Sequence, residues 1–283
     1  MRHILKTIAL LGIAVISAPV FGADQARPGT VNYIEGAAFL QGKQLNPHDV
    51  GSLEMAPGQV LRTGAGKTEI LLNPGVYLRV DDHSAVKMIS PDITPTQVEL
   101  DRGRAAVEVD QIFPQNDLEV TNGGVTTHLA KTGYYEFDAN RPTALVFKGE
   151  AVVDEGDGRY RTLKAHHEMA LVEGVRAKPF SFNEQDAEDG LYRWSSLRSQ
   201  YLAEANYQIA GGYAGVPGFY PGWYWDPYMW DYTFIGAGPF WSPFGLGFYP
   251  PWWGGFYGAG FYGGFRGGGF HGGGFHGDGG GRR

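Results

Sequence analysis

The sequence predicts an all-β domain, then one amphipathic helix, then a low-complexity tail rich in glycine and aromatic residues. Between residues 28 and 182, short apolar or alternating runs are separated by Gly, Pro, Asn and Asp, a pattern typical of β-strands joined by turns. Residues 183–210 instead repeat apolar side chains at helical spacing. After residue 210 no hydrophobic period remains, although six of the seven Trp residues lie there.

Residues 1–22 have the features of a secretory signal peptide. Two basic residues precede an apolar run from Ile8 to Val20, which is too short to span a bilayer core of roughly 30 Å comfortably as a helix. Val20 and Gly22 supply the small residues of a cleavage site. We therefore expect an exported mature chain that begins at Ala23 and has no transmembrane span. We expect it to be periplasmic, associated with the cell envelope or extracellular, with an uncleaved membrane anchor as the alternative.

Composition excludes several classes of function. The chain has no Cys, which excludes disulfide bonds, thiol catalysis and Cys-based metal sites. Two of the 23 basic residues lie in the predicted signal peptide, so the mature chain has 21 basic and 30 acidic residues and a net charge of −9. A negative body repels phosphate backbones, and we therefore expect no nucleic-acid partner.

The strand-like segments of the β-domain are short and closely spaced. They span residues 31–40, 59–64, 67–73, 76–80, 84–89, 97–103, 104–110, 118–123, 125–131, 133–139, 144–149, 150–156 and 167–174. Pro57-Gly58 and Pro74-Gly75 suit type II turns, because Pro fixes φ and Gly accepts the left-handed position. Asn122-Gly123 and Asp157-Gly158 suit two-residue hairpin turns, whose central residues need positive φ.

Residues 183–210 are predicted to form the amphipathic helix. Acidic residues lie near its start, where the helix dipole favours negative charge. We expect its apolar stripe to pack on the β-domain, and a partner-binding role for the stripe is the alternative. The stripe consists of Leu191, Trp194, Leu197, Tyr201, Leu202 and Ala205.

The tail divides into an aromatic, Gly- and Pro-rich segment, residues 211–262, and a nearly pure glycine segment, residues 263–283. Glycine entropy and missing proline N–H groups oppose regular helix or sheet in the first segment. The second segment is expected to be disordered. We therefore expect residues 28 to about 210 to fold without the tail.

Aromatic rings in the tail are the candidate contact surface of the protein. Exposed Trp and Tyr rings can stack on sugars, on other aromatic rings or at membrane interfaces. We hypothesise that they bind a glycan, an envelope protein or a second copy of the chain. The alternative is that residues 211–251 wrap around the β-domain and bury the rings in a satellite core. The rings of this hypothesis belong to Trp223, Tyr224, Trp225, Trp230, Trp241, Trp252 and Trp253.

No residue pattern indicates an active site. The segment GAGKT, residues 64–68, lacks the spacing of a phosphate-binding loop, because the first glycine of that motif would fall at Leu61. Thr68 also begins a strand, whereas the motif requires a helix. Ser195 is expected on the solvent-exposed side of the helix and is not part of a nucleophile elbow. We expect no catalytic residues, no cofactor and no enzymatic activity.

Clusters of potential metal ligands are equally weak as indications of a binding site. His166, His167 and Glu168 are consecutive, and neighbouring residues on a strand point to opposite faces, so no two adjacent ones share a site. His271 and His276 in the tail are only two ligands on a glycine-rich chain. We therefore expect no metal site.

Several segments resemble the FecR domain in their order and spacing. VLRTG at residues 60–64 and KTEILL at 67–72 resemble one strand pattern of that family. VELDRGR at 98–104 and VFKGEAVV at 146–153 are similar to two later motifs. The resemblance covers residues 28–175 and implies a FecR-like β-roll or solenoid-like domain without catalytic residues.

The resemblance also bears on function. The resemblance implies comparison with FecR regulators, which combine a cytoplasmic anti-sigma segment, a membrane helix and a periplasmic part to pass a signal across the membrane. In this chain only about six residues precede the apolar run. We therefore expect an exported bacterial FecR-domain protein without the cytoplasmic anti-sigma segment. Our first hypothesis is a non-catalytic envelope scaffold or binding module whose aromatic tail makes the contacts. The alternative is an accessory or sensory component of FecR-type envelope signalling or transport regulation.

Overall fold

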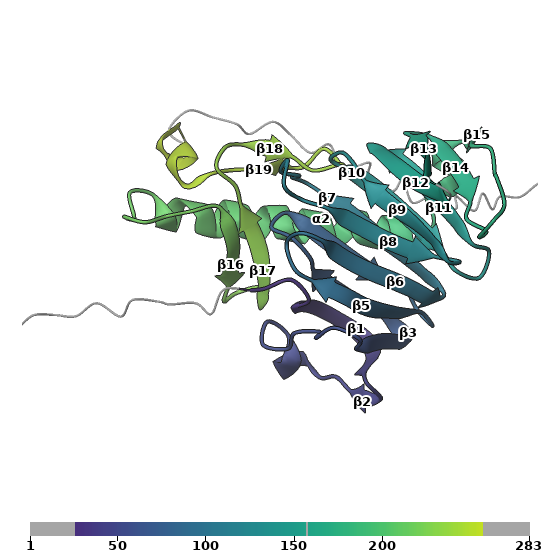
Figure 1. The fold of residues 1–283 in the computed structure, drawn as a ribbon. Helices are drawn as coiled ribbons and strands as arrows, with labels where there is room; N and C mark the ends of the chain where they lie inside the picture. Colours follow the sequence, from purple (N-terminus) through teal and green to yellow (C-terminus); the bar gives the residue numbers. More distant parts are fainter. Residues whose placement is uncertain (1–25, 157, 257–283) are drawn as a thin grey trace, which may run out of the picture.

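The computed structural model of the protein describes residues 26–156 and 158–256 (Figure 1). The predicted signal peptide, residues 1–22, and the predicted disordered segment, residues 263–283, lie outside the described residues. Within the described part of the chain, no helix combines the length and the apolar character needed to cross a membrane.

Most of the described chain forms one fifteen-stranded sheet. Its strands are β1 (Val31–Leu40), β2 (Lys43–Gln44), β3 (Val60–Leu71), β4 (Val76–Val80), β5 (Ala85–Pro91), β6 (Thr96–Arg102), β7 (Arg104–Val109), β8 (Leu118–Asn122), β9 (Val125–Leu129), β10 (Gly133–Asp138), β11 (Thr143–Lys148), β12 (Glu150–Gly156), β13 (Arg159–Lys164), β14 (His167–Ala170) and β15 (Phe180–Ser181). β6 and β8 pair in parallel, and the other strand pairs of this sheet are antiparallel.

The sheet curls into two facing layers (Figure 1). The first layer has the order β13-β12-β9-β8-β6-β5, and the second has the order β4-β7-β10-β11-β14-β15. β3 belongs to both layers, because its first residues pair with β5 and its last residues pair with β4. β1 runs beside β3 through both halves.

The main hydrophobic core lies between the two layers. Val86 and Leu100 from the first layer and Leu78 and Val107 from the second belong to one buried cluster. Burying apolar surface stabilises a fold by about 25 cal/mol per Å². This core is therefore the main stabilising term of the β-domain. The predicted all-β fold is confirmed.

The two strand segments predicted around GAGKT are one continuous strand, β3. Gly66 of this strand pairs with Gly36 of β1. A Cβ atom on Gly66 would lie 2.1 Å from the carbonyl oxygen of Glu35, so only glycine permits this approach. The glycines of GAGKT therefore bring two strands together, and Thr68 lies on the strand as expected.

The predicted type II turns at Pro57-Gly58 and Pro74-Gly75 are confirmed. Their glycines have φ of +81° and +79°, and a backbone hydrogen bond of 3.0 and 2.7 Å closes each turn. The hairpin between β8 and β9 turns at Gly123-Gly124, one residue later than predicted, because Asn122 still pairs with Val125. Asp157 of the other predicted hairpin turn lies outside the described residues.

The sequence pattern does not predict β13. This strand lies at the edge of the first layer, and Leu163 is its only buried residue. Charged residues on an edge strand protect the sheet from pairing with other chains, but they remove the apolar alternation by which a strand is recognised.

Two helices occupy the predicted helical region, α1 (Glu184–Ala187) and α2 (Gly190–Ala210). Asp189 caps α2, because its carboxylate accepts hydrogen bonds from the backbone N–H groups of Leu191 and Tyr192, at 2.8 and 3.2 Å. α2 lies against the outer face of the second layer (Figure 1). The described residues also contain three short 3₁₀ helices, η1 (Pro47–Asp49), η2 (Gly211–Tyr213) and η3 (Pro251–Phe256).

The buried side of α2 differs from the predicted apolar stripe. Leu197 and Tyr201 are 44% and 43% exposed. Ser195, which was expected to face solvent, is instead fully buried, with its Oγ 3.0 Å from the Tyr134 hydroxyl. The helix buries polar residues because the sheet face beneath it carries the buried charges of Glu69, Arg79 and Glu108. Its buried polar residues are Ser195, Arg198, Ser199 and Asn206.

Residues 211–256, which we name the tail module, contain regular structure. The strands β16 (Gly222–Asp226) and β17 (Asp231–Ile235) form one hairpin, and β18 (Phe240–Trp241) and β19 (Gly247–Phe248) form another. The expectation that this segment lacks regular sheet is therefore wrong. Aromatic residues occur on both faces of these strands, so no apolar alternation marks them in the sequence.

Candidate functional site

A buried charge network lies on the outer face of the second layer, beneath α2. Glu69 of β3 pairs in register with Arg79 of β4, and the Arg79 Nε donates to Glu69 Oε2 at 2.9 Å. The other end of the Arg79 guanidinium pairs with Glu108 of β7. All three side chains are inaccessible to solvent. Such charges on a sheet face imply that another part of the chain covers them.

The helix and the tail module complete this network. Arg198 of α2 donates from Nη2 to Glu69 Oε1 at 3.0 Å and to Asp231 Oδ2 of β17 at 2.8 Å. Ser199 of α2 donates to Glu108 Oε1 at 2.8 Å. A buried charge is tolerated only when it is paired and hydrogen bonded. The network therefore fixes the sheet, the helix and the tail module in one arrangement.

The network shifts the pKa values of Glu69 and Asp231 in opposite directions. Burial raises the pKa of Glu69, but the guanidinium groups of Arg198 and Arg79 outweigh burial and lower this pKa to about 2. Burial, together with the nearby charges of Glu69 and Asp226, raises the pKa of Asp231 to about 6, although Arg198 opposes the shift. Of these two side chains, Glu69 is therefore the stronger acid and Asp231 is the weaker one.

Two buried asparagines hold the backbone of the tail module. The Asn32 side chain of β1 donates to the Tyr232 carbonyl at 3.0 Å and accepts from the Tyr232 N–H at 2.7 Å. The Asn206 side chain of α2 donates to the carbonyls of Phe234 and Tyr249, at 3.1 and 3.2 Å, and accepts from the Tyr249 N–H at 2.7 Å. These contacts replace the hydrogen bonds that the tail backbone would otherwise make to water.

Apolar contacts reinforce this attachment. Trp223 is only 7% exposed and packs edge-on against Tyr77 of β4, with ring centroids 5.1 Å apart. It also packs against Phe234 at 5.7 Å. These rings form a second buried cluster with Leu71 and Leu202. Part of the aromatic segment is therefore a satellite core, which was the alternative drawn from the sequence.

The seven aromatic residues of the contact hypothesis occupy different environments. Trp223 is buried in the satellite core, and Tyr224 and Trp225 are half-buried. Trp225 packs on the loop before β3, where a Cβ atom on Gly51 would lie 2.5 Å from its ring. The remaining four tryptophans are exposed. Their exposed fractions are 65% for Trp230, 65% for Trp241, 58% for Trp252 and 39% for Trp253.

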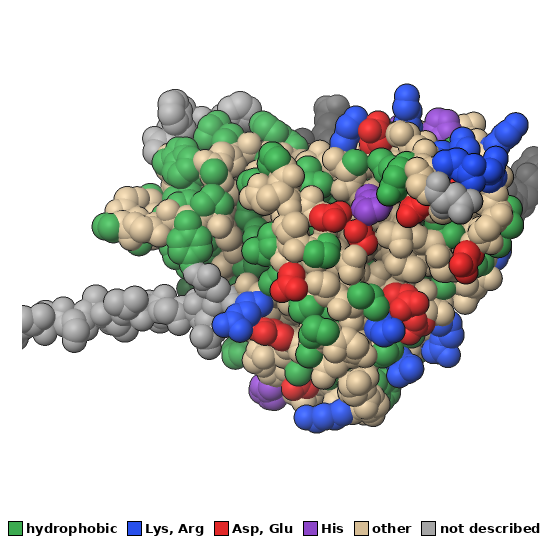
Figure 2. Space-filling view, in the orientation of Figure 1, with side chains coloured by type: hydrophobic (Ala, Val, Ile, Leu, Met, Phe, Trp, Pro, Cys, Tyr) green, Lys and Arg blue, Asp and Glu red, His purple; other side chains and the backbone are tan. Residues whose placement is uncertain are grey.

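The outer surface of the tail module carries no charged side chain. Between residues 211 and 256 the only acidic residues are Asp226 and Asp231, which are both buried, and there is no Lys, Arg or His. Figure 2 shows the corresponding region as hydrophobic and neutral, whereas charged side chains are scattered over the β-domain. We name this surface, with its exposed tryptophans, the aromatic face.

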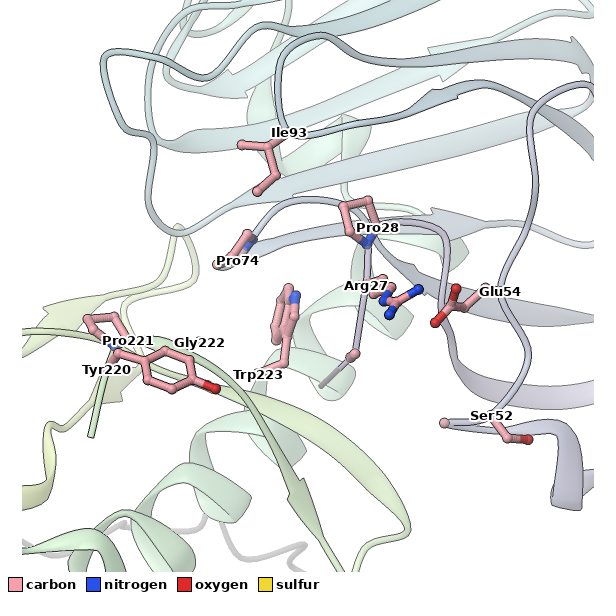
Figure 3. A pocket seen from close by; sticks show the side chains of 12 residues that line it. Arg27, Pro28, Ser52, Glu54, Pro74, Ile93, Tyr220, Pro221, Gly222 and Trp223 are labelled. Carbon is pink, nitrogen blue, oxygen red and sulfur yellow. The ribbon is translucent and has the colours of Figure 1, made fainter. Parts of the chain in front are cut away.

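A hollow of about 640 Å³ adjoins the tail module. Figure 3 shows the Trp223 indole between Tyr220 and the segment of Arg27 and Pro28, with Glu54 nearby. The volume of this hollow falls within the range of small-molecule sites, roughly 300 to 1,000 Å³. The Trp223 Nε1 has no hydrogen-bond partner among the described residues.

The residues that position the aromatic face were not predicted from the sequence. Glu69, Arg79 and Glu108 occupy strands as single charged residues, which normally face solvent. The one available signal is on α2, where Arg198 and Asn206 fall on the same helical face as Leu202. A charged residue within an apolar stripe indicates a buried charged partner on the facing sheet.

Residues 59–152, from the start of β3 into β12, match the family model described as FecR protein. Two crystal structures of candidate anti-sigma factors from Parabacteroides distasonis ATCC 8503 are similar to the chain. One has a TM-score of 0.35 and 14% identity, and the match covers 44% of this chain and 58% of the other. The second has a TM-score of 0.36 and 9% identity, with 62% and 97% covered. None of the curated proteins compared with the chain matches it. The match over residues 59–152 of the β-domain confirms the FecR resemblance that the motifs indicate.

Proposed function

We propose that the protein is a non-catalytic, exported envelope protein that binds an uncharged envelope component through the aromatic face. The observation that carries this proposal is that all four exposed tryptophans of the described chain lie on the tail module, whose surface has no charge. Monomeric soluble proteins rarely leave large apolar patches bare, and such patches mark interaction sites.

The attachment of the tail module supports a binding role. The buried charge network and the two asparagines fix its hairpins to the β-domain, so the exposed rings are held in place before a partner arrives. A preorganised surface loses less conformational entropy on binding. The hollow beside Trp223 adds a concave attachment point at the border of the tail module and the β-domain.

The chemistry of the aromatic face favours a partner recognised by ring stacking, namely a glycan strand, an apolar protein surface or a second copy of this chain. Trp and Tyr rings offer large apolar area together with a polar edge. Because the face has no charge, long-range attraction is absent, and binding should change little between low and high salt.

The test compares the protein with a variant carrying Trp230→Ala, Trp241→Ala and Trp252→Ala. If each ring contributes about 1 kcal/mol, the variant should bind roughly 100-fold more weakly. Pull-down with envelope glycan and with solubilised envelope protein, together with sedimentation velocity, separates the three kinds of partner. Trp223 is left intact because it belongs to the satellite core.

The matched control carries Tyr160→Ala and Phe180→Ala, which remove rings of the β-domain that are 62% and 54% exposed. It should bind as the parent protein does. Equal binding by the parent and the tryptophan variant, with both folded, would remove the aromatic face from the function.

A second candidate function is an accessory or sensory component of FecR-type envelope signalling or transport regulation. The family match over residues 59–152 favours it. This candidate requires a signalling partner, so the gene should lie beside one for a sigma factor or an outer-membrane receptor. Deletion of the protein should then alter expression of that receptor, whereas loss of a binding module should leave expression unchanged.

A further inference from the structure

Three potential metal ligands meet on the first layer of the β-domain. Asp117 directly precedes β8, Glu119 lies two residues later on the same face, and His128 of β9 pairs in register with Glu119. The His128 Nδ1 lies 3.2 Å from Asp117 Oδ1 and 3.6 Å from Glu119 Oε1. The three ligand atoms all lie within 4.8 Å of one another.

The two separations from the His128 nitrogen match the edges of a metal coordination polyhedron. A tetrahedral divalent ion with ligand bonds of about 2.1 Å places neighbouring ligand atoms roughly 3.4 Å apart. The two distances from the imidazole nitrogen, 3.2 and 3.6 Å, fall on either side of this value. We propose that Asp117, Glu119 and His128 bind a divalent transition-metal ion of the Zn²⁺ type.

A neighbouring strand orients one of the ligands. Gln97 of β6, which pairs in register with Glu119, donates from Nε2 to Glu119 Oε2 at 2.6 Å. This bond occupies one carboxylate oxygen and leaves Oε1 directed toward His128. Hydrogen bonds of this kind to a ligating carboxylate fix its geometry and strengthen metal binding.

The backbone before β8 is also fixed. The Thr96 N–H donates to the Asp117 carbonyl at 2.8 Å, so the position of Asp117 does not depend on a free loop. The three ligand side chains form a gradient of accessibility, at 15% for Glu119, 32% for His128 and 46% for Asp117. A shallow hollow borders Asp117 and His128 and leaves room for water as a further ligand.

The donor set selects the class of metal. Two carboxylates and a neutral imidazole carry a charge of about −2, which a divalent cation balances. Mg²⁺ and Ca²⁺ prefer all-oxygen sites, whereas an imidazole nitrogen favours Zn²⁺, Cu²⁺ or Ni²⁺. The simpler alternative is that His128 only hydrogen-bonds or ion-pairs with the two acids, without a metal ion.

Calorimetric titration with Zn²⁺ distinguishes the site from the ion pair. The purified protein, stripped with a chelator, should bind one Zn²⁺ at this site and show no comparable response to Mg²⁺. His128→Ala, Asp117→Asn and Glu119→Gln should each weaken Zn²⁺ binding about tenfold or more, and Gln97→Ala should weaken it less. Circular dichroism verifies that each variant is folded.

The control variants are His167→Ala, another histidine of the β-domain, and the tail double variant His271→Ala/His276→Ala. Both should retain the Zn²⁺ affinity of the parent protein. If His128→Ala binds Zn²⁺ as well as the parent does, or if the tail double variant removes the binding, the site is absent and the three residues are an ion pair. An absence of Zn²⁺ binding by the parent overturns the proposal in the same way.

Discussion

Arg198 is the residue at which the sheet, the helix and the tail module meet. It pairs with Glu69 and Asp231, and its guanidinium lies 4.0 Å from the centroid of the Tyr33 ring. Only 3% of Arg198 is exposed. When its side chain is removed, water therefore does not take its place as a partner of Glu69 and Asp231.

Arg198→Met should therefore destabilise the protein by about 3–5 kcal/mol, since it leaves Asp231 buried without a counter-ion. The free energy of unfolding, measured by urea denaturation, tests this. Arg193→Met changes an exposed arginine of the same helix and should cost less than about 1 kcal/mol. Adding Asp231→Asn to Arg198→Met should recover part of the loss, and strictly additive effects would contradict the coupling.

Glu136 gives the protein a measurable pH dependence. Burial raises its pKa from 4.5 to about 7, although Arg104 opposes the shift. A raised pKa in the folded state stabilises the protein most below the unfolded value, and this contribution disappears as the pH rises through the folded value. The free energy of unfolding should thus fall between about pH 4.5 and 7.

Glu136→Gln should remove up to about 3 kcal/mol of this pH-dependent change, because a shift of one pKa unit corresponds to about 1.36 kcal/mol. Urea denaturation at a series of pH values measures it, as the difference between parent and variant. Glu204→Gln, at an exposed position of α2, serves as the control. Parallel pH profiles for the parent protein and Glu136→Gln would contradict the raised pKa of Glu136.

At the scale of elements, α2 acts as the connector between the sheet and the two hairpins of the tail module. Asn206 contributes three hydrogen bonds to this contact, and Thr233 of β17 donates to the Leu202 carbonyl at 2.7 Å. These bonds join elements that are far apart in sequence. Because a two-stranded hairpin has little stability of its own, the hairpins of the tail module depend on such bonds.

Asn206→Ala should release the hairpins before the β-domain unfolds. The expected cost is about 1–3 kcal/mol in the local opening free energy, because two carbonyls and one N–H lose their partner. Native-state hydrogen exchange should show faster exchange in residues 222–249 and unchanged exchange in β7 and β10. Gln208→Ala, an exposed change on α2, should leave exchange as it is; equal protection in both variants would contradict the role of Asn206.

At the scale of the whole molecule, the tail module is built into the core. Removing it would expose Leu71, Tyr77 and Leu202 and would leave Arg198 without Asp231. The sequence led us to expect that residues 28 to about 210 fold alone. From the structure we expect the opposite, that these residues need the tail module to fold.

A chain ending at Ala210 should therefore lose cooperative thermal unfolding or aggregate, with reduced near-ultraviolet circular dichroism and increased binding of a hydrophobic dye. A chain ending at residue 256 is the control, because it keeps both hairpins, and it should melt as the parent does. Cooperative melting of the shorter chain near the parent's temperature would show that the β-domain and α2 are self-sufficient.

Local patterns in the sequence determined much of this structure. Alternation predicted most strands, Pro57-Gly58 and Pro74-Gly75 predicted their turns, and the order of motifs indicated the FecR family. These features depend on backbone preferences and on neighbours a few residues away, which a single sequence displays directly.

Only the tertiary structure decided which side chains are covered. Ser195 and Glu69 look solvent-facing in sequence, yet they are buried where α2 crosses the sheet. The tail rings divide into satellite core and aromatic face because β16 and β17 dock beside β1, and the Asp117, Glu119 and His128 cluster exists because β8 pairs with β9. Burial and ligand geometry depend on contacts between segments distant along the chain, and no local period encodes such contacts.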